Sequence, residues 1–183
     1  APYLNPDTDL VKFLRSKYRK GNEKLVGISW SSRPPKGIAL NQFSPLFQMP
    51  GFKFINLQYG DCSTEIQTFE KKFGYQLLTD EEINPLLNID KFVAQVASMD
   101  AVVTVQNSTL YAAGGLGIPT FAIVPPVPEW RWLGNEEKSP WHKGVWLYHR
   151  SRQPEEQGLR RTISKIREDL SHLMVGNQGI VGS

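Results

Sequence analysis

The sequence predicts an open α/β domain in which a doubly wound parallel sheet is covered by helices on both faces. Short apolar runs such as residues 25–30 and 101–105 are continuous instead of alternating, as strands buried on both faces require. These runs alternate along the chain with helical patterns, which implies βαβ units with right-handed crossovers. A chain of 183 residues is long enough for one such domain with its own hydrophobic core.

Local signals define the elements of the first half. Residues 1–6 hold two prolines and no periodicity, so we interpret them as a linker. Asp7 or Thr8 can cap a helix that reaches about Lys20, where a Gly-Asn pair stops it. Next in order we expect a strand at 25–30, a short helix at 41–48, a strand at 52–57, a polar helix at 63–73 and a short strand at 75–78.

The second half continues the alternation. Asp90 can cap a helix whose apolar residues share one face, and the strand at 101–105 follows it. Asn107 or Ser108 can cap the next helix. The remaining elements are strands at 119–124 and 145–148 and an amphipathic helix at 155–173. We therefore expect one domain over residues 7–174 and a flexible tail at 175–183.

Composition excludes several classes of protein. A net charge of +3 with scattered Lys and Arg is too small for a nucleic-acid footprint, and no apolar run approaches the roughly 20 residues of a membrane span. The single cysteine, Cys62, rules out an internal disulfide and favours a cytoplasmic protein. The chain has no nicotinamide or Walker A fingerprint, so we expect no cofactor. We also expect no metal, because the histidines are far apart and the Asp7-Thr8-Asp9 pair is explained by helix capping.

Polar residues gather where the predicted strands end, which is where open parallel sheets bind ligands. These stretches are residues 29–33, 58–61 and 106–109. The helix that begins near Ser108 directs unpaired N–H groups and the positive end of its dipole toward this edge. Together with the Ser and Thr hydroxyls, these groups form a neutral cradle suited to a phosphate or diphosphate. The alternative is that Asn-Ser-Thr is only an N-cap.

Several segments also match a known family, in order and at its spacing. They are residues 2–4, 26–30, 57–61, the stretch VQNSTLYAAGGLGIP at 105–119, and a Trp-rich region at 129–132 and 139–141. On these segments the chain resembles the C-terminal, donor-binding half of a GT-B glycosyltransferase of the heptosyltransferase-like group, which is family 9-like. It is most similar to the version found at the C-terminus of tetratricopeptide-repeat proteins.

The resemblance implies metal-independent transfer of a sugar from a nucleotide-sugar to an acceptor. The diphosphate would lie at the helix start, and the loops after the first two strands would complete the donor pocket. In physical terms, the helix start would replace a divalent cation in stabilising the charge that develops on the leaving diphosphate. The implied substrate-binding residues are Ser29, Trp30, Ser31, Gln58, Tyr59, Gly60, Gln106, Asn107, Ser108, Thr109 and Tyr111. No catalytic residue is assigned, because the acceptor domain and usually the catalytic base belong to the N-terminal half of such enzymes.

Two residues depart from the family pattern. Gln106 stands where the family usually has aspartate, and Tyr111 where it has histidine. The glutamine keeps hydrogen bonding but loses the charge, and the tyrosine cannot carry a proton near pH 7 without a large change of its pKa. These departures leave an alternative open: a non-catalytic α/β interaction module with a decayed donor site. A third possibility is a phosphate-binding domain unrelated to sugars.

The partners implied are a nucleotide-sugar donor and an N-terminal acceptor domain or repeat region, if the chain belongs to a longer protein. Without that domain, we expect the 183 residues not to turn over. A cluster of exposed tryptophans has two interpretations: packing against the last helix and the sheet edge, or an interface to the missing half. The cluster comprises Trp130, Trp132, Trp141 and Trp146.

Overall fold

A computed structural model describes residues 2–127, 132, 137–150 and 155–172. It contains a five-stranded sheet, and the strands are β1 (Lys24–Ser29), β2 (Phe52–Asn56), β3 (Ala101–Val105), β4 (Thr120–Val124) and β5 (Val145–His149). The helices are α1 (Thr8–Tyr18), the 3₁₀ turn η1 (Leu40–Phe43), α2 (Ser44–Phe47), α3 (Ser63–Phe73), α4 (Ile89–Ala97), α5 (Ser108–Leu116) and α6 (Glu155–Ser171). In the described part of the chain, no helix is long and apolar enough to cross a membrane.

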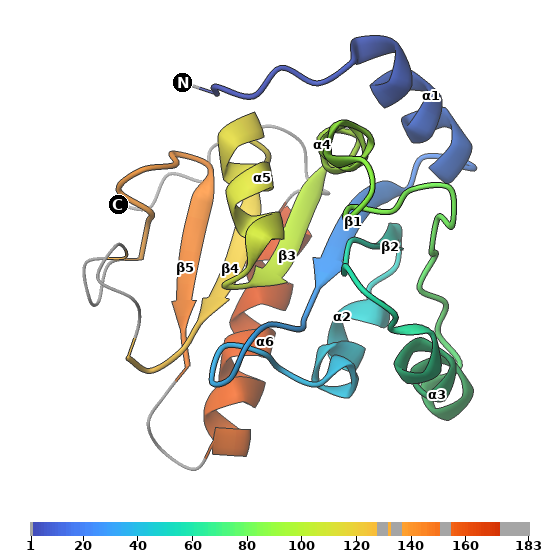
Figure 1. The fold of residues 1–183 in the computed structure, drawn as a ribbon. Helices are drawn as coiled ribbons and strands as arrows, with labels where there is room; N and C mark the ends of the chain where they lie inside the picture. The colour runs from blue at the N-terminus through green and yellow to red at the C-terminus, as the bar shows by residue number, and fades with distance from the viewer. Residues whose placement is uncertain (1, 128–131, 133–136, 151–154, 173–183) are drawn as a thin grey trace.

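All neighbouring strands run parallel, in the order β2-β1-β3-β4-β5 (Figure 1). The chain therefore winds outward from β1 in one direction to β2 and in the other to β3. Crossovers on opposite sides leave a crevice at this switch point, outside the carboxyl ends of β1 and β3. The predicted doubly wound α/β fold is confirmed.

Helices cover both faces of the sheet, which explains the continuous apolar strands. On one face, η1, α2, α3 and α6 enclose a core with β1, β3 and β4, in which Phe43, Ile66 and Ile163 are buried. On the other face, α1, α4 and α5 enclose a second core around Leu25 and Phe92.

Two predicted elements differ from the structure. The strand expected at 75–78 is a single parallel bridge between Leu78 and Ile55, because the chain turns away directly after it. The helix α4 begins two residues earlier than expected and is capped by Asn88, whose side-chain oxygen accepts from the Lys91 amide at 2.9 Å. Asp90 lies in the first turn, where a carboxylate complements the helix dipole.

Charged side chains hold α1 against the amino-terminal edge of the sheet. Asp100, just before β3, accepts from Arg15, from Arg19 at 2.9 Å and from the Leu25 amide at 2.8 Å. One carboxylate thus joins a helix to two adjacent strands. Burial alone would raise the pKa of Asp100, but the Leu25 amide and the two guanidinium groups outweigh it and hold the pKa below its usual value.

The tryptophan cluster is not uniformly exposed. Trp132 is fully buried and its ring lies 6.0 Å from that of Tyr111, so it covers the α5 side of the sheet beside β4 and β5. Trp146 stacks on Phe121 at 5.7 Å, and Trp141 is 61% exposed. Trp130 lies outside the described residues. The exposed cluster predicted from the sequence was therefore wrong for Trp132, whose ring packs against Tyr111 in a buried cluster.

Candidate functional site

The structure brings the predicted β1 and β2 strand ends together through one glutamine. The side-chain oxygen of Gln58 accepts three hydrogen bonds, from the Ser29 hydroxyl at 3.1 Å and from the amides of Trp30 and Ser31 at 3.0 and 2.8 Å. Gln58 is itself buried, and its amide nitrogen donates to the Tyr59 carbonyl at 3.2 Å. Its amide therefore fixes the path of the loop that leaves β1.

Asn107 fixes the β3 end in the same network. Its amide nitrogen donates to the Ser29 hydroxyl at 2.7 Å and to the Ser31 carbonyl at 3.1 Å. Its oxygen caps α5 by accepting from the Thr109 amide at 3.0 Å, and it also accepts from Thr104 at 3.1 Å. Asn107 is therefore an N-cap, as the alternative interpretation of the sequence held. The same side chain also ties the helix to the β1 loop.

The start of α5 is only partly open. The Thr109 amide is taken by Asn107, and Thr109 is fully buried, whereas Ser108 is exposed. The first turn of α5 holds no charged side chain, so its dipole is not offset locally. No group of three or more His, Cys, Asp or Glu in the described residues could hold a metal ion.

Other predicted site residues occupy different surroundings. Trp30 is 1% exposed, and its indole N–H donates to Glu65 at 2.8 Å, so its ring belongs to the core. Tyr59 is half-buried, and Gly60 is exposed with a φ of 83°, a conformation that favours glycine. Tyr111 stacks on Trp132 and lies one turn into α5.

Gln106, which precedes Asn107, has a buried side chain that takes no part in this hydrogen-bond network. It is 2% exposed, yet neither its side-chain oxygen nor its nitrogen has a hydrogen-bond partner among the described residues. Only its backbone carbonyl is engaged, by the Ser32 hydroxyl at 3.0 Å. A buried polar group without a partner lowers the stability of the fold by about 1–3 kcal/mol, so the Gln106 amide is expected to destabilise the chain without a ligand.

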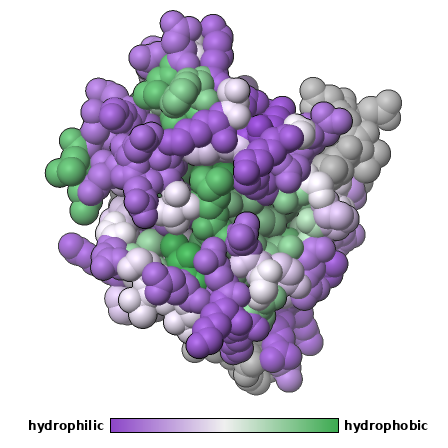
Figure 2. All heavy atoms as spheres, turned by 90° about the vertical axis from the view of Figure 1, so that its right-hand side faces the viewer, coloured by the Kyte–Doolittle hydropathy of each residue, from purple (hydrophilic) through white to green (hydrophobic). Residues whose placement is uncertain are grey.

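A cavity of about 660 Å³ opens beside this network, at the end of β2. Leu57 and Gln58 lie on its inner side, and α3 and the segment 77–86 form its walls. Figure 2 views this side of the molecule, where hydrophobic atoms gather in the middle of a hydrophilic surface. The hydrophobic lining comes from Leu57, Ile66, Leu77, Ile83, Pro85 and Leu86.

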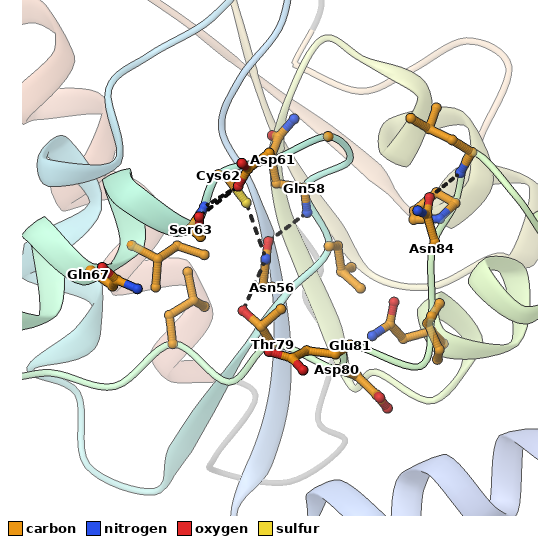
Figure 3. A pocket seen from close by; sticks show the side chains of 18 of the residues that line it. Asn56, Gln58, Asp61, Cys62, Ser63, Gln67, Thr79, Asp80, Glu81 and Asn84 are labelled. Carbon is orange, nitrogen blue, oxygen red and sulfur yellow. Dashed lines mark hydrogen bonds between the residues drawn. The ribbon is translucent and has the colours of Figure 1, made fainter.

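Asn56 organises the polar side of this cavity (Figure 3). It accepts from the Gln58 amide at 2.8 Å and donates to Thr79 at 3.2 Å and to the Cys62 sulfur at 3.5 Å. The cavity therefore shares Gln58 with the β1 loop, and the two features form one continuous region.

The cavity lining is acidic. It includes four carboxylates, Asp61, Glu70, Asp80 and Glu81, and no lysine or arginine. Hydrogen bonds from Ser63 lower the pKa of Asp61. For Asp80 burial would raise the pKa, but bonds from Tyr18 at 2.6 Å and Lys17 at 3.0 Å outweigh it and keep the pKa below its usual value. Both groups are therefore anionic near pH 7.

Sequence reasoning missed most of the cavity. Asn56 was assigned to a strand interior, and the segment 77–86 was not connected with the sheet edge. The single bridge at Leu78 brings that segment alongside β2. The predicted strand-end stretch 29–33 includes Arg33, but Lys36 on the same loop was missed. The Lys36 amide donates to the Arg33 carbonyl at 3.0 Å and closes a turn. The place of Lys36 in the loop that follows a buried strand was the signal available.

Comparisons with known proteins found one similar sequence and several solved structures with a similar fold. No family model matches the chain. Protein FlbA of Caulobacter vibrioides is 32% identical over 150 residues, which is 78% of this chain and 25% of that protein. Among solved structures, the E. coli ADP-heptose lipopolysaccharide heptosyltransferase II is similar with a TM-score of 0.65 and 14% identity, and it matches over 95% of this chain and 54% of its own.

Two further structures agree with it. A glycosyl transferase family 9 protein from Veillonella parvula has a TM-score of 0.68 at 12% identity, over 95% of this chain and 54% of that one. The E. coli heptosyltransferase WaaC, solved with ADP, has a TM-score of 0.62 at 10% identity, over 93% and 51%. The chain thus has the fold found in heptosyltransferases and family 9 glycosyltransferases, and spans about half of each solved chain and a quarter of FlbA.

Proposed function

We propose that this chain forms the donor-binding half of a metal-independent glycosyltransferase and binds a nucleotide-sugar. The observation that carries the proposal is the continuity of two features at the carboxyl edge of the sheet. Gln58 both lines the 660 Å³ cavity and holds the β1 loop against Asn107 at the start of α5. A ligand with a bulky neutral part and an anionic part fits two such adjoining environments.

The charges orient that ligand. An acidic cavity with an apolar floor accepts hydrogen bonds from ribose hydroxyls and from the N–H groups of a base, but repels a phosphate. The diphosphate belongs at the other end, where Ser108 is exposed at the start of α5 and the β1 loop contributes Arg33 and Lys36. These cations and the helix start stabilise negative charge on a leaving diphosphate without a metal ion.

The acceptor side is supplied from outside this chain in our proposal. The similar solved structures are about twice as long, and the chain matches about half of each. A second domain facing the carboxyl edge of the sheet would bind the acceptor and supply the catalytic base. A repeat region preceding the chain, as the sequence resemblance implies, remains part of this proposal.

Cys62 offers a direct test of where the ligand binds. It is the single cysteine, lies half-buried in the cavity lining, and has a pKa raised mainly by burial. Millimolar UDP, GDP or ADP is expected to raise the melting temperature for at least one nucleotide, and that nucleotide should slow alkylation of Cys62 by iodoacetamide. A melting temperature unchanged across the whole panel contradicts nucleotide binding. Stabilisation without protection of Cys62 contradicts the placement in this cavity.

Lys36→Met tests whether the diphosphate of the donor binds at the β1 loop. Loss of one cation near a diphosphate is expected to weaken nucleotide binding about tenfold, since a charge-assisted hydrogen bond contributes about 1.5–3 kcal/mol. Lys12→Met is the matched control, because Lys12 lies exposed on α1 away from the carboxyl edge. Equal affinities of the two variants would argue against a diphosphate at the β1 loop.

One observation favours a second candidate, the non-catalytic interaction module. The Thr109 amide and the Gln58 oxygen are already satisfied by the chain's own groups, so the network is closed without a ligand. Such a module predicts no nucleotide binding at all, and the thermal panel above separates the two. In Gln106→Asp, a gain of nucleotide binding would indicate a decayed donor site instead.

A further inference from the structure

The turn before α4 exposes a group of apolar side chains. Leu86, Leu87 and Ile89 are 70%, 84% and 59% exposed and follow one another closely in the chain. Single exposed apolar residues are normal at a protein surface, whereas a contiguous group marks an interaction site. We call these three residues the apolar knob.

Hydrogen bonds hold the backbone of the apolar knob in place. The side-chain oxygen of Asn84 accepts from the Leu86 amide at 2.9 Å (Figure 3), and its carbonyl accepts from the amides of Leu87 and Asn88 at 3.1 and 3.0 Å. Asn88 then caps α4. Because this turn is already ordered, a partner that buries the knob has little conformational entropy to remove from it.

Carboxylates surround the apolar knob. Residues 80–90 include four of them and no lysine or arginine. Lys17 pairs with Asp80 at 3.0 Å and with Glu82 at 2.6 Å, so these two are offset within the chain. Glu81 and Asp90 remain as exposed anions beside the knob. The knob therefore fits an apolar groove that carries positive charge, and an anionic lipid surface would repel it.

A groove of that kind lies on the same chain, between α6 and the turn that precedes β2. The cavity there has a volume of about 570 Å³, which leaves room for leucine side chains. Its apolar side is formed by Met49, Pro50 and Phe52, and its polar side by α6. We call this cavity the α6 groove.

The α6 groove carries positive charge. Residues 157–167 of the helix include three arginines and one lysine and no carboxylate. Two carboxylates follow, but Lys165 pairs with Asp169 at 3.0 Å and lies 3.9 Å from Glu168. Arg167 is exposed and lines the groove. The groove thus complements the knob in both polarity and charge.

The knob and the groove lie on opposite faces of the sheet. Ile83, which precedes the knob, packs with α4 in the core around Phe92. Met49 of the groove is buried in the other core, which α6 covers. The knob of one chain therefore does not reach the groove of that same chain, but it is free to enter the groove of another.

We propose that this chain associates head to tail with a second copy of itself, the apolar knob of one copy entering the α6 groove of the next. Glu81 and Asp90 then face Arg167 across the contact. Such a contact is heterologous, so each dimer keeps one free knob and one free groove, and further copies can add. This inference is independent of the proposed donor function. Because Leu86 also lines the 660 Å³ cavity, a docked copy lies at the edge of that cavity.

Sedimentation velocity over about a hundredfold range of concentration measures the association, because a contact of this size belongs to the weak end of protein interfaces. The wild-type chain is expected to pass from monomer to dimer and longer oligomers as its concentration rises. Leu87→Ser removes apolar area from the knob, and Arg167→Glu places a carboxylate opposite carboxylates. Each should weaken the association at least about tenfold.

Two control variants make the same chemical changes elsewhere. Phe13→Ser removes an exposed apolar side chain from α1, and Arg161→Glu reverses an exposed charge on α6 outside the groove lining. Both should associate as the wild-type chain does. All four substituted side chains are exposed, so the melting temperatures should stay close to that of the wild-type chain.

A mixture decides whether the contact is head to tail. Leu87→Ser keeps its groove and Arg167→Glu keeps its knob, so the two variants together form one intact contact. An equimolar mixture should recover the dimer with an affinity close to that of the wild-type chain, but no longer oligomers. A wild-type chain that stays monomeric over the whole range, knob and groove variants that associate as the controls do, or a mixture that stays monomeric would each overturn the proposal.

Discussion

The two edges of the sheet satisfy their polar groups in opposite ways. At the amino-terminal edge, Asp100 collects Arg15, Arg19 and the Leu25 amide, and both of its oxygens are used. At the carboxyl ends of β1 and β3 the hydrogen-bonded groups are neutral, and the amide of Gln106 has no partner among the described residues. Saturation is incomplete at both edges, since the Arg19 Nε and one Glu23 oxygen at the amino-terminal edge are also buried without a partner among the described residues. The difference between the edges lies in the chemistry of the bonds: a carboxylate and two guanidinium groups hold the amino-terminal edge, whereas amides and hydroxyls hold the ends of β1 and β3.

Asp100→Ala should be the most damaging change. It leaves two arginines and a strand amide without their acceptor, and removing one partner of a buried charge network costs about 3 kcal/mol. Urea unfolding measures the loss. Asp90→Ala is the control, because this exposed carboxylate only complements the dipole of α4 and should cost under about 1 kcal/mol. Equal losses in both variants would show that the Asp100 network does not stabilise the amino-terminal edge.

Gln58→Met should come second. The change leaves the Ser29 hydroxyl and the amides of Trp30 and Ser31 without their shared acceptor. We expect the free energy of unfolding to fall by about 2 kcal/mol, less than three full desolvation penalties because water can reach exposed Ser31. Gln67→Met, an exposed change in the same cavity lining, should leave stability within about 0.5 kcal/mol. Equal free energies of unfolding in the two variants would show that the three hydrogen bonds to the Gln58 oxygen do not stabilise the fold.

Acid should weaken the folded chain both at the Asp100 network of the amino-terminal edge and at Asp80 in the cavity lining. Asp80 and Asp100 have pKa values below those of unfolded aspartate, so the folded chain binds fewer protons. Their contribution is present above the unfolded pKa of about 3.9 and is lost as pH falls through the folded values. Melting temperature against pH from 2 to 7 should therefore fall on the acid side, and Asp100→Asn should flatten that fall. An identical acid limb in both proteins would contradict the assigned pKa direction.

The sequence predicted the sheet well because continuous apolar strands and capped helices are local signals. Strand β3 and helix α3 have the expected bounds, and Asn107 is the cap of α5. The site was predicted as a set of strand ends, and the structure does bring Ser29, Gln58 and Asn107 into contact. What could not be predicted is which partner each side chain finds.

Pairings across long sequence separations have no local signature. Gln58 bonds to the β1 loop 27–29 residues away, and Asn107 reaches Ser29 across 78. The cavity depends on a bridge between Leu78 and Ile55, which brings the segment 77–86 alongside β2. The residue pattern at 75–78 does not distinguish such a bridge from a full strand. The resemblance implies that Trp30 belongs to the donor site. Its burial and its bond to Glu65 of α3 depend on tertiary packing, which no local pattern predicts.

Gln106→Met should have the smallest effect on stability and the opposite sign. Replacing a buried amide that has no partner by an apolar chain of similar length removes a desolvation cost and breaks no side-chain bond. We expect the free energy of unfolding without ligand to rise by about 0.5–1 kcal/mol, measured by urea unfolding beside Gln58→Met. The same substitution would thus stabilise one buried glutamine position and destabilise the other. A loss of stability at both would mean that Gln106 has a partner in the folded chain, and the contrast between the two glutamines would disappear.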